Sequence, residues 1–283
     1  KIDTVAGANT ANIKVTAIYT DGTSEDVTSQ AIATPDQIGV VEISNGVVTG
    51  LAFGTTSISV SYGGKTDVLY VTVGTTSGGG NVAWYKFDEA DGAVVIDSSG
   101  NGNDATIIGA TGPRVEGRFG NALRLQSSSS QYVRLPNGIV SDLGDFTIAT
   151  WINPSTMATW ARIFDLGNGT NTNMFLTLRA SSNNQPRFAI RVNGSSEQQL
   201  TAGSGFTLSA NTWYHIAITK SGNTGRMYLN GRLAATNTNM TFSPKDMGIT
   251  NNNWIGRSQY SADPYLNGIV DDFSIYDYAL SQE

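Results

Sequence analysis

Two segments of the sequence combine aromatic rings with side chains that can hydrogen-bond to many hydroxyl groups. One is Trp160-Ala161-Arg162-Ile163-Phe164-Asp165, and the other runs from Arg257 to Tyr265. Sugars present C–H faces that stack on aromatic rings, and hydroxyls that need both donors and acceptors. The two segments therefore predict a carbohydrate-binding site formed by Trp160, Arg162, Asp165, Arg257, Gln259, Tyr260, Asp263 and Tyr265.

The aromatic residues also have structural interpretations. Trp160 can cap the core beneath a loop, whereas Tyr260 and Tyr265 lie in a segment rich in Ser, Asp and Pro that favours exposure. Trp151 and Trp213 lie in strongly apolar segments, so we expect them to be core residues.

Alternation along the predicted strands assigns several side chains to faces. It places Ile163 on one face and both Arg162 and Phe164 on the other, which leaves the burial of Arg162 open. Arg187 and Arg191 are expected to share a face, either lining a concave binding surface or forming a solvated strand face.

Residues for acid–base or nucleophilic catalysis are scarce. His215 is the single histidine, it lies in an apolar run, and the chain has no Cys. A lone His in such a run is usually structural. Glycoside hydrolysis needs two facing carboxylates, and Glu is rare after residue 80. We therefore expect no enzymatic activity, with a carboxylate pair assembled from distant strands as the alternative.

The composition limits the class of partner. Charged residues make up 14% of the 283, the net charge is −6, and no run of Lys or Arg suggests a nucleic-acid-binding surface. No apolar stretch approaches the roughly 18 residues of a membrane span, so we expect no membrane insertion. Every Arg lies after residue 74. Arg makes planar, forked hydrogen bonds to oxygen-rich ligands, which favours recognition by that part.

Short alternating segments separated by turn signals predict an all-β chain. Turns such as Asp21-Gly22 and Asn45-Gly46 separate the strands of residues 1–74, and residues 75–80 have the composition of a flexible linker. Roughly a dozen strands in 81–283 predict a larger two-sheet sandwich. They are expected at 82–87, 122–126, 131–135, 145–153, 161–166, 174–179, 187–192, 213–219, 225–229 and 269–276.

Residues 1–74 contain Tyr19-Thr20-Asp21-Gly22-Thr23, Asn45-Gly46-Val47-Val48-Thr49-Gly50 and Gly54-Thr55-Thr56-Ser57-Ile58. In these stretches the first part resembles the bacterial Ig-like group 2 modules, and the resemblance extends over all of it. It implies a small Ig-like sandwich. Modules of this kind are usually spacers, so the implied role is structural.

Residues 81–283 contain Tyr85-Lys86-Phe87-Asp88-Glu89, Phe146-Thr147-Ile148-Ala149-Thr150-Trp151-Ile152 and Gly268-Ile269-Val270-Asp271-Asp272-Phe273-Ser274-Ile275-Tyr276. These stretches resemble the laminin-G-like, concanavalin-A-like family that is often appended to glycoside hydrolases. The resemblance implies a jelly-roll sandwich that binds carbohydrate without cleaving it. It also implies that the first and last strands of the domain lie side by side.

The expected pairing of the end strands brings acidic residues together. Asp88 would approach Asp271 and Asp272, with Asn103 in the nearby loop 97–104. Hard oxygen ligands favour Ca²⁺. The resemblance thus implies a structural Ca²⁺ site formed by Asp88, Asn103, Asp271 and Asp272, whereas the alternative is that these side chains cap turns or are solvated.

We therefore expect a domain that binds a polysaccharide or oligosaccharide and holds a larger secreted bacterial glycan-degrading enzyme at its substrate. The chain begins at Lys1 and shows no signal sequence, so we expect an internal piece, linked to neighbouring domains and monomeric. The alternative is a cell-surface adhesion or protein-interaction module, or an inert scaffold domain. Arabinan, xylan, fructan and galactan remain open as ligands.

Overall fold

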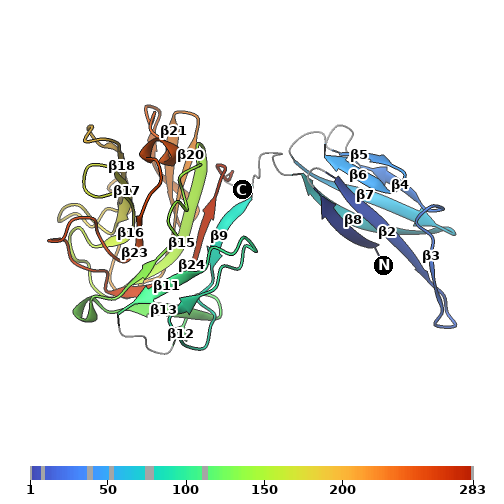
Figure 1. Ribbon diagram of the computed structural model, residues 1–283, viewed down its shortest axis with the longest axis horizontal. Coiled ribbons are helices and arrows are strands. Elements are labelled where there is room, and N and C mark those ends of the chain that lie inside the picture. The colour runs from blue at the N-terminus through green and yellow to red at the C-terminus, as the bar shows by residue number, and fades with distance from the viewer. Residues whose placement is uncertain are drawn as a thin grey trace. The chain divides into compact units, whose positions relative to one another are not determined.

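The computed structural model describes residues 2–7, 10–36, 41–50, 54–73, 80–109 and 114–281. The prediction of an all-β chain is confirmed, since the regular elements there are strands apart from two short 3₁₀ helices, η1 (Ser127–Ser129) and η2 (Pro244–Met247). The chain forms two compact units, Lys1–Gly80 and Asn81–Glu283 (Figure 1). Of the predicted linker, only Gly80 is among the described residues. None of the described helices has the length and apolar character needed to cross a membrane.

The first unit consists of two antiparallel sheets around a small apolar core. One has the order β1-β2-β6-β5 with β3 paired to β2, and the other has the order β4-β7-β8. Ile13, Val27 and Ile58 are buried between them. The strands are β1 (Ile2–Gly7), β2 (Thr10–Ile18), β3 (Ser24–Asp26), β4 (Ile32–Pro35), β5 (Val41–Ser44), β6 (Val47–Gly50), β7 (Gly54–Tyr62) and β8 (Lys65–Val73).

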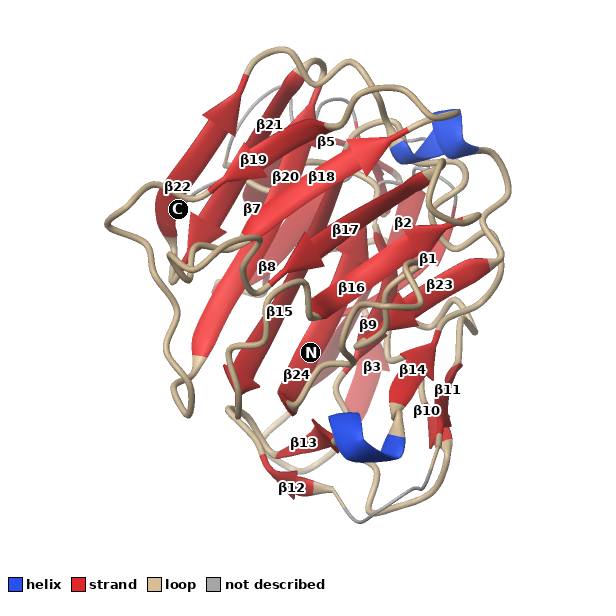
Figure 2. Ribbon diagram, turned by 90° about the vertical axis from the view of Figure 1, so that its left-hand side faces the viewer, coloured by secondary structure: helices blue, strands red, loops and turns tan. Residues whose placement is uncertain are grey.

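The second unit consists of two larger sheets. Sheet I has the order β10-β11-β14-β23-β16-β17-β18-β19. Its strands are β10 (Val94–Val95), β11 (Ala105–Ile108), β14 (Tyr132–Arg134), β16 (Arg162–Gly167), β17 (Asn173–Thr177), β18 (Arg187–Arg191), β19 (Gln198–Thr201) and β23 (Asn252–Ile255). Figure 2 shows this sheet towards the viewer, with the strands of the second sheet behind it.

Sheet II has the order β12-β13-β24-β15-β20-β21-β22, with β9 paired to β24. Its strands are β9 (Asn81–Tyr85), β12 (Val115–Glu116), β13 (Asn121–Leu125), β15 (Phe146–Pro154), β20 (Tyr214–Ser221), β21 (Thr224–Leu229), β22 (Arg232–Asn237) and β24 (Gly268–Tyr276). The expected neighbourhood of the first and last strands is confirmed, because β9 runs antiparallel to β24 with Tyr85 opposite Phe273 and Asn81 opposite Tyr276.

Phenylalanine rings join the two sheets in the core. Phe164 of sheet I lies edge-on to Phe273 of sheet II at 5.9 Å, and Phe188 lies 6.2 Å from Phe146. Aromatic rings dominate the apolar area of a core, so these contacts help to fix the spacing of the sheets. Trp151, which we predicted to be a core residue, is half-buried on the outer face of sheet II instead, where it contacts Phe119 and His215.

Candidate functional site

The outer face of sheet I, turned away from sheet II, carries a continuous row of side chains. Residues directly opposite each other on neighbouring strands project to the same face of a sheet. The register of seven neighbouring strands aligns Thr106, Arg134, Trp254, Asp165, Phe175, Ala189 and Gln199. This face therefore presents charged, aromatic and small residues in one line, and most of the predicted binding residues lie on it or above it.

A β-bulge in β16 decides which of its side chains face outward. The register between β16 and β17 shifts between Arg162 and Phe164, and both Ile163 and Phe164 belong to the apolar core. The prediction that Phe164 shares a face with Arg162 is therefore wrong, because simple alternation does not survive an inserted residue. As a result, Arg162 and Asp165 point to the outer face.

Arg162 is a buried anchor. Its side chain is only 2% exposed, and its guanidinium lies 4.1 Å from the centre of the Phe175 ring. Nη1 donates to the carbonyl of Trp160 at 2.8 Å, and Nη2 lies 3.0 Å from Oδ2 of Asp263. Because its guanidinium is buried and held by these contacts, Arg162 positions its neighbours, and the expected direct contact with sugar hydroxyls does not fit its burial.

Asp165 lies at the centre of the row and is fully buried. Its Oδ1 accepts a hydrogen bond from Asn173 Nδ2 at 2.8 Å, and its Oδ2 accepts one from the backbone N–H of Gln259 at 3.0 Å. Burial raises the pKa of Asp165 to about 6, against the opposing effect of the Arg162 guanidinium 3.4 Å away. Like Arg162, Asp165 is buried away from solvent, and it fixes the positions of Asn173 and Gln259.

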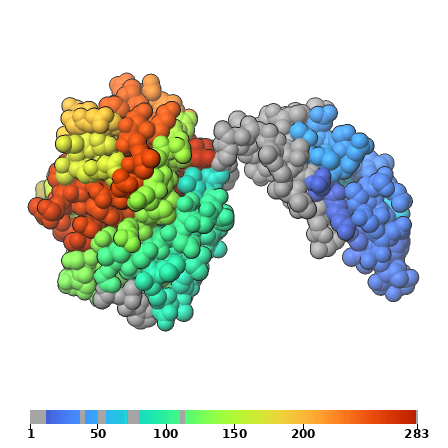
Figure 3. Space-filling model, in the orientation of Figure 1, coloured from blue at the N-terminus to red at the C-terminus, as the bar shows by residue number. Residues whose placement is uncertain are grey.

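The segment 256–266, called here the bridging loop, crosses the centre of this face. Its backbone is fastened to Asp165 through Gln259, whose side chain also donates to the carbonyl of Asn252 at 2.8 Å. Within the loop, Ser258 donates to Asp263 at 2.8 Å. The hydroxyl of Tyr260 donates to the carbonyl of Thr170 at 3.3 Å. In the space-filling view the orange-red surface of this region adjoins the yellow surface of the strands beside it (Figure 3).

Trp160 stands at one side of the bridging loop in a strained backbone conformation. Its φ is 65°, which is rare for a bulky residue, and its N–H donates to the carbonyl of Arg179. The half-buried ring has Arg162 at 5.3 Å and Arg187 at 5.5 Å from its centre. Arg187 forms an ion pair with Glu197. Backbone strain at a positive φ persists only where the surrounding contacts hold the residue firmly in that conformation.

Arg257 and Tyr265 belong to a second aromatic cluster, on the β14 side of the loop. The guanidinium of Arg257 lies 4.2 Å from the Trp254 ring and 4.8 Å from the Tyr132 ring, and donates to the Tyr132 hydroxyl at 2.9 Å. The Tyr265 ring lies 6.1 Å from that of Tyr132. The predicted residues thus fall into two groups separated by the bridging loop.

Sequence analysis missed several members of this face. Glu197 and Phe175 were not predicted, and for Arg187 and Arg191 a concave binding surface was one of two interpretations, the other being a solvated strand face. Arg187 and Arg191 are both half-buried on that face. The alternation of charged and apolar residues in β18 was the signal that could have found Arg187, whereas nothing in the sequence pairs it with Glu197.

Two of the acidic residues predicted to bind metal, Asp88 and Asp271, lie against the turn 117–121. Oδ2 of Asp271 accepts hydrogen bonds from the N–H groups of Arg118 at 2.7 Å and Phe119 at 3.0 Å. Oδ1 of Asp88 accepts one from Asn121 at 2.8 Å. A Cβ atom at Gly117 or Gly120 would clash with these carboxylates, so the turn approaches them as closely as glycine permits.

Only two of the four predicted metal ligands have a free donor oxygen near that turn. Oδ1 of Asp271 is buried without a hydrogen-bond partner, and burial raises the pKa of this carboxyl to about 6. Asp272 instead accepts a hydrogen bond from the Trp84 indole at 2.8 Å, and the Asn103 amide donates to the carbonyl of Val82. Among the described residues, no three His, Cys, Asp or Glu side chains gather at one point. Asp88 and Asp271 are therefore the two predicted ligands that lie against this turn.

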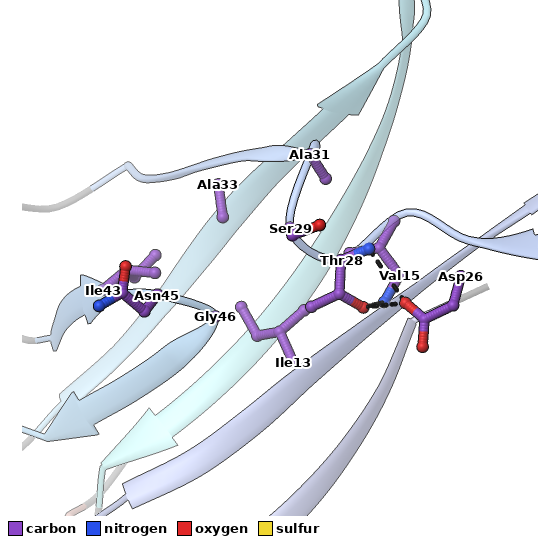
Figure 4. Close-up of a pocket in the computed structure, with 10 residues that line it drawn as sticks. All are labelled: Ile13, Val15, Asp26, Thr28, Ser29, Ala31, Ala33, Ile43, Asn45 and Gly46. Carbon is purple, nitrogen blue, oxygen red and sulfur yellow. Dashed lines mark hydrogen bonds between the residues drawn. The ribbon is translucent and has the colours of Figure 1, made fainter.

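The first unit has a hollow of its own, with a volume of about 620 Å³, but its chemistry is limited. Figure 4 shows that Asp26 and Thr28 hydrogen-bond to each other there, and Thr28 also accepts from the N–H of Val15. The described lining contains no aromatic ring and no Arg. Asp26 and Thr28 are already bonded to each other, so the outer face of sheet I is the better candidate.

Solved structures with a similar fold include a domain of an arabinanase and the binding domains of a neurotoxin and of a mosquitocidal protein. Domain 4 of AbnA, a GH43 extracellular arabinanase from Geobacillus stearothermophilus solved with arabinotriose, superposes with a TM-score of 0.60 at 24% identity, covering 72% of this chain and 95% of that domain. The botulinum neurotoxin serotype D/C binding domain gives 0.56 at 17%, covering 72% and 50%. The binding domain of Paraclostridial Mosquitocidal Protein 1 gives 0.51 at 19%, again covering 72% and 50%.

The chain thus spans about half the length of the toxin domains, and at these identities the likeness is one of fold. No curated protein sequence matches it. Residues 127–283 match the family described as the concanavalin A-like lectin/glucanases superfamily. This match covers more than half of the chain and agrees with the two-sheet sandwich of the second unit. The protein belongs to the concanavalin A-like lectin/glucanases superfamily.

Proposed function

We propose that residues 81–283 bind a polysaccharide or oligosaccharide, without cleaving it, on the outer face of sheet I beside Trp160. The observation that carries this proposal is the half-buried Trp160 ring, held at a positive φ and close to two guanidinium groups. A fixed ring surrounded by planar donors suits the C–H face and the hydroxyls of a sugar. The arabinotriose complex of the arabinanase domain with the same fold supports this choice of ligand class.

The residues of the site have different roles in this proposal. Trp160 and Tyr260 provide stacking surfaces, and the Arg187–Glu197 pair supplies a donor and an acceptor at the surface. Gln259 and Asp263, both half-buried, supply further hydroxyl contacts. Arg162 and Asp165 act through these groups, by holding Trp160 and the bridging loop in place. Binding of a single module is expected to be weak, with a Kd between about 1 μM and 1 mM.

The wider role that we propose is an accessory one. The domain would keep a secreted glycan-degrading enzyme close to its substrate, with the first unit as an Ig-like spacer. Its fold relative in an extracellular arabinanase supports this context. Avidity from neighbouring modules would compensate for weak individual binding.

We also propose that Asp88 and Asp271 hold a structural Ca²⁺ at the turn 117–121. The unpartnered Oδ1 of Asp271 supports the proposal, since a buried carboxylate oxygen without a partner is costly. A hard cation would satisfy that oxygen and tie the turn to β24.

The test is calorimetric titration of the full chain with neutral and acidic plant and microbial polysaccharides. Trp160→Ala is expected to abolish or strongly weaken binding, while Phe119→Ala, which removes a ring 58% exposed on sheet II, leaves it unchanged. If the folded protein gives no heat with any glycan, the carbohydrate proposal fails and an adhesion or scaffold role replaces it.

A further inference from the structure

Sheet I has an open depression on the far side of the bridging loop from Trp160. Its volume is about 490 Å³, and its lining comes from β11, β14, β23 and the turns at 135–137 and 251. Thr106, Arg134 and Trp254 are direct neighbours across the strands, and Tyr132 shares their face two residues before Arg134. The depression is therefore built on rigid strands rather than on loops alone.

Several polar groups in this depression have no partner of their own. Arg134 is exposed, and among the described residues its guanidinium forms no ion pair or hydrogen bond; the same holds for the side-chain amide of Asn252. On the Trp160 side, by contrast, Arg162 and Arg187 are both paired with carboxylates. The forked donors of Arg134 are thus free for a ligand.

Arg257 of the bridging loop holds the aromatic part of the depression in place. Tyr132 and Trp254 meet edge-on at 6.0 Å. Arg257, which does not line the depression, stacks on both rings and fixes the Tyr132 hydroxyl at 2.9 Å. Rings that are already fixed cost little conformational entropy when they receive a ligand.

The charges of the lining select the class of ligand. The exposed carboxylate of Asp104 stands in the same depression as Arg134, and only its Oδ1 is used, by the N–H of Asp97 at 2.8 Å. One guanidinium and one carboxylate leave no net charge, while together with the Asn252 amide they offer both donors and acceptors. This combination suits the hydroxyls of a neutral sugar and gives no preference for a uronate.

We propose that this depression is a second carbohydrate-binding site, which takes a neutral sugar residue and works independently of the Trp160 site. Asp165 lies buried between the two and is bonded to the bridging loop, so the loop separates the two sites at the centre of the row. A short oligosaccharide therefore occupies one site or the other, and the chain has two binding events. A long polysaccharide engages both, which raises the avidity.

The experiment is NMR titration of the isotope-labelled full chain with neutral oligosaccharides and with uronate-containing oligosaccharides of equal length. Arg134→Met and Trp160→Ala are compared with the wild type, and Arg226→Met on sheet II serves as the matched control. Neutral oligosaccharides are expected to shift the indole signal of Trp254 and the Nε signal of Arg134. The binding curve of these two signals should give a Kd different from that of the Trp160 indole signal. Arg134→Met should weaken that event by about tenfold or more and leave the Trp160 event unchanged.

The outcomes separate this proposal from the proposed function. If only the Trp160 signals move, the second site is overturned while carbohydrate binding stands. If only the Arg134 and Trp254 signals move, the second site stands and the Trp160 assignment fails. A response of Arg134 to uronates alone overturns the neutral ligand class, and no response from any signal overturns both proposals.

Discussion

The guanidinium of Arg162 lies 3.0 Å from the carboxylate of Asp263 and thereby ties strand β16 to the bridging loop. The Arg162 side chain is almost fully buried and that of Asp263 is 18% exposed. At this depth the partners depend on each other, because removing one leaves an uncompensated charge out of contact with water. The position of the loop that divides the sheet face therefore depends on this pair and on the neighbouring Asp165.

Replacing Arg162 should destabilise the second unit. Arg162→Met leaves the buried Asp165 carboxylate without its cation, and breaking a buried pair costs about 3 kcal/mol or more. Chemical denaturation checks this, with Arg226→Met as the control because Arg226 has no ion pair among the described residues. An unchanged free energy of unfolding would mean that the pair contributes nothing net.

The stability conferred by Asp165 should depend on pH. Burial raises the pKa of Asp165 from 3.8 to about 6, so the folded state binds this proton more tightly than the unfolded state does. The free energy of unfolding should therefore increase as the pH falls from about 6 to about 4, by at most about 3 kcal/mol. The same contribution is lost as the pH rises again through 6.

The measurement compares wild type with Asp165→Asn by denaturant unfolding between pH 7 and pH 4. The wild type should gain stability relative to the variant as the pH falls. Asp271, whose pKa is also about 6, titrates in both proteins and cancels in the comparison. A constant difference across the range would contradict the prediction.

Calcium should stabilise the protein through Asp88 and Asp271. At a concentration about 100 times its Kd, a ligand of the folded state contributes about 2.7 kcal/mol, which raises Tm by about 5 to 10 °C. Asp88→Asn and Asp271→Asn should each abolish this rise, and EDTA should reverse it in the wild type. Asp272→Asn is the control, because that carboxylate bonds to the Trp84 indole. Loss of the calcium response in Asp272→Asn as well would assign the site to different atoms.

The positive φ of Trp160 leads to a prediction about two small substitutions. Both Trp160→Gly and Trp160→Ala remove the ring, but only glycine adopts φ of 65° without a steric cost from Cβ. The glycine variant should therefore be more stable by about 1 kcal/mol, which thermal or chemical unfolding can measure. Equal stability of the two variants would show that the backbone relaxes once the ring is gone.

The long strands could be predicted because their alternation extends over many residues. Phe146–Pro154 and Gly268–Tyr276 lie within one residue of the predicted limits. Short strands were missed: β23 begins with two Asn residues, which are typical of turns, and it is a strand because β14 and β16 pair with its two edges. Pairing with distant strands, rather than local preference, decides such segments.

The sequence also revealed which residue types gather at the candidate site, but not their depth. Trp160, Gln259 and Asp263 lie near the surface as half-buried groups. Arg162 and Asp165 were expected to contact ligand, yet the bulge in β16 and the loop above it bury both. Neither a bulge nor the path of a covering loop leaves a periodic signal that could have predicted this.

The antiparallel pairing of β9 with β24 has a mechanical consequence. Asn81, where the second unit begins, lies opposite Tyr276, the last residue of its last strand. In a polypeptide that continues on both sides, tension would pull these neighbouring ends apart and would load the hydrogen bonds between the two strands one after another rather than together. The unit would then unzip from this edge at low force, and Asp88, which follows the far end of β9, would separate from Asp271 only after the hydrogen bonds between β9 and β24 had opened.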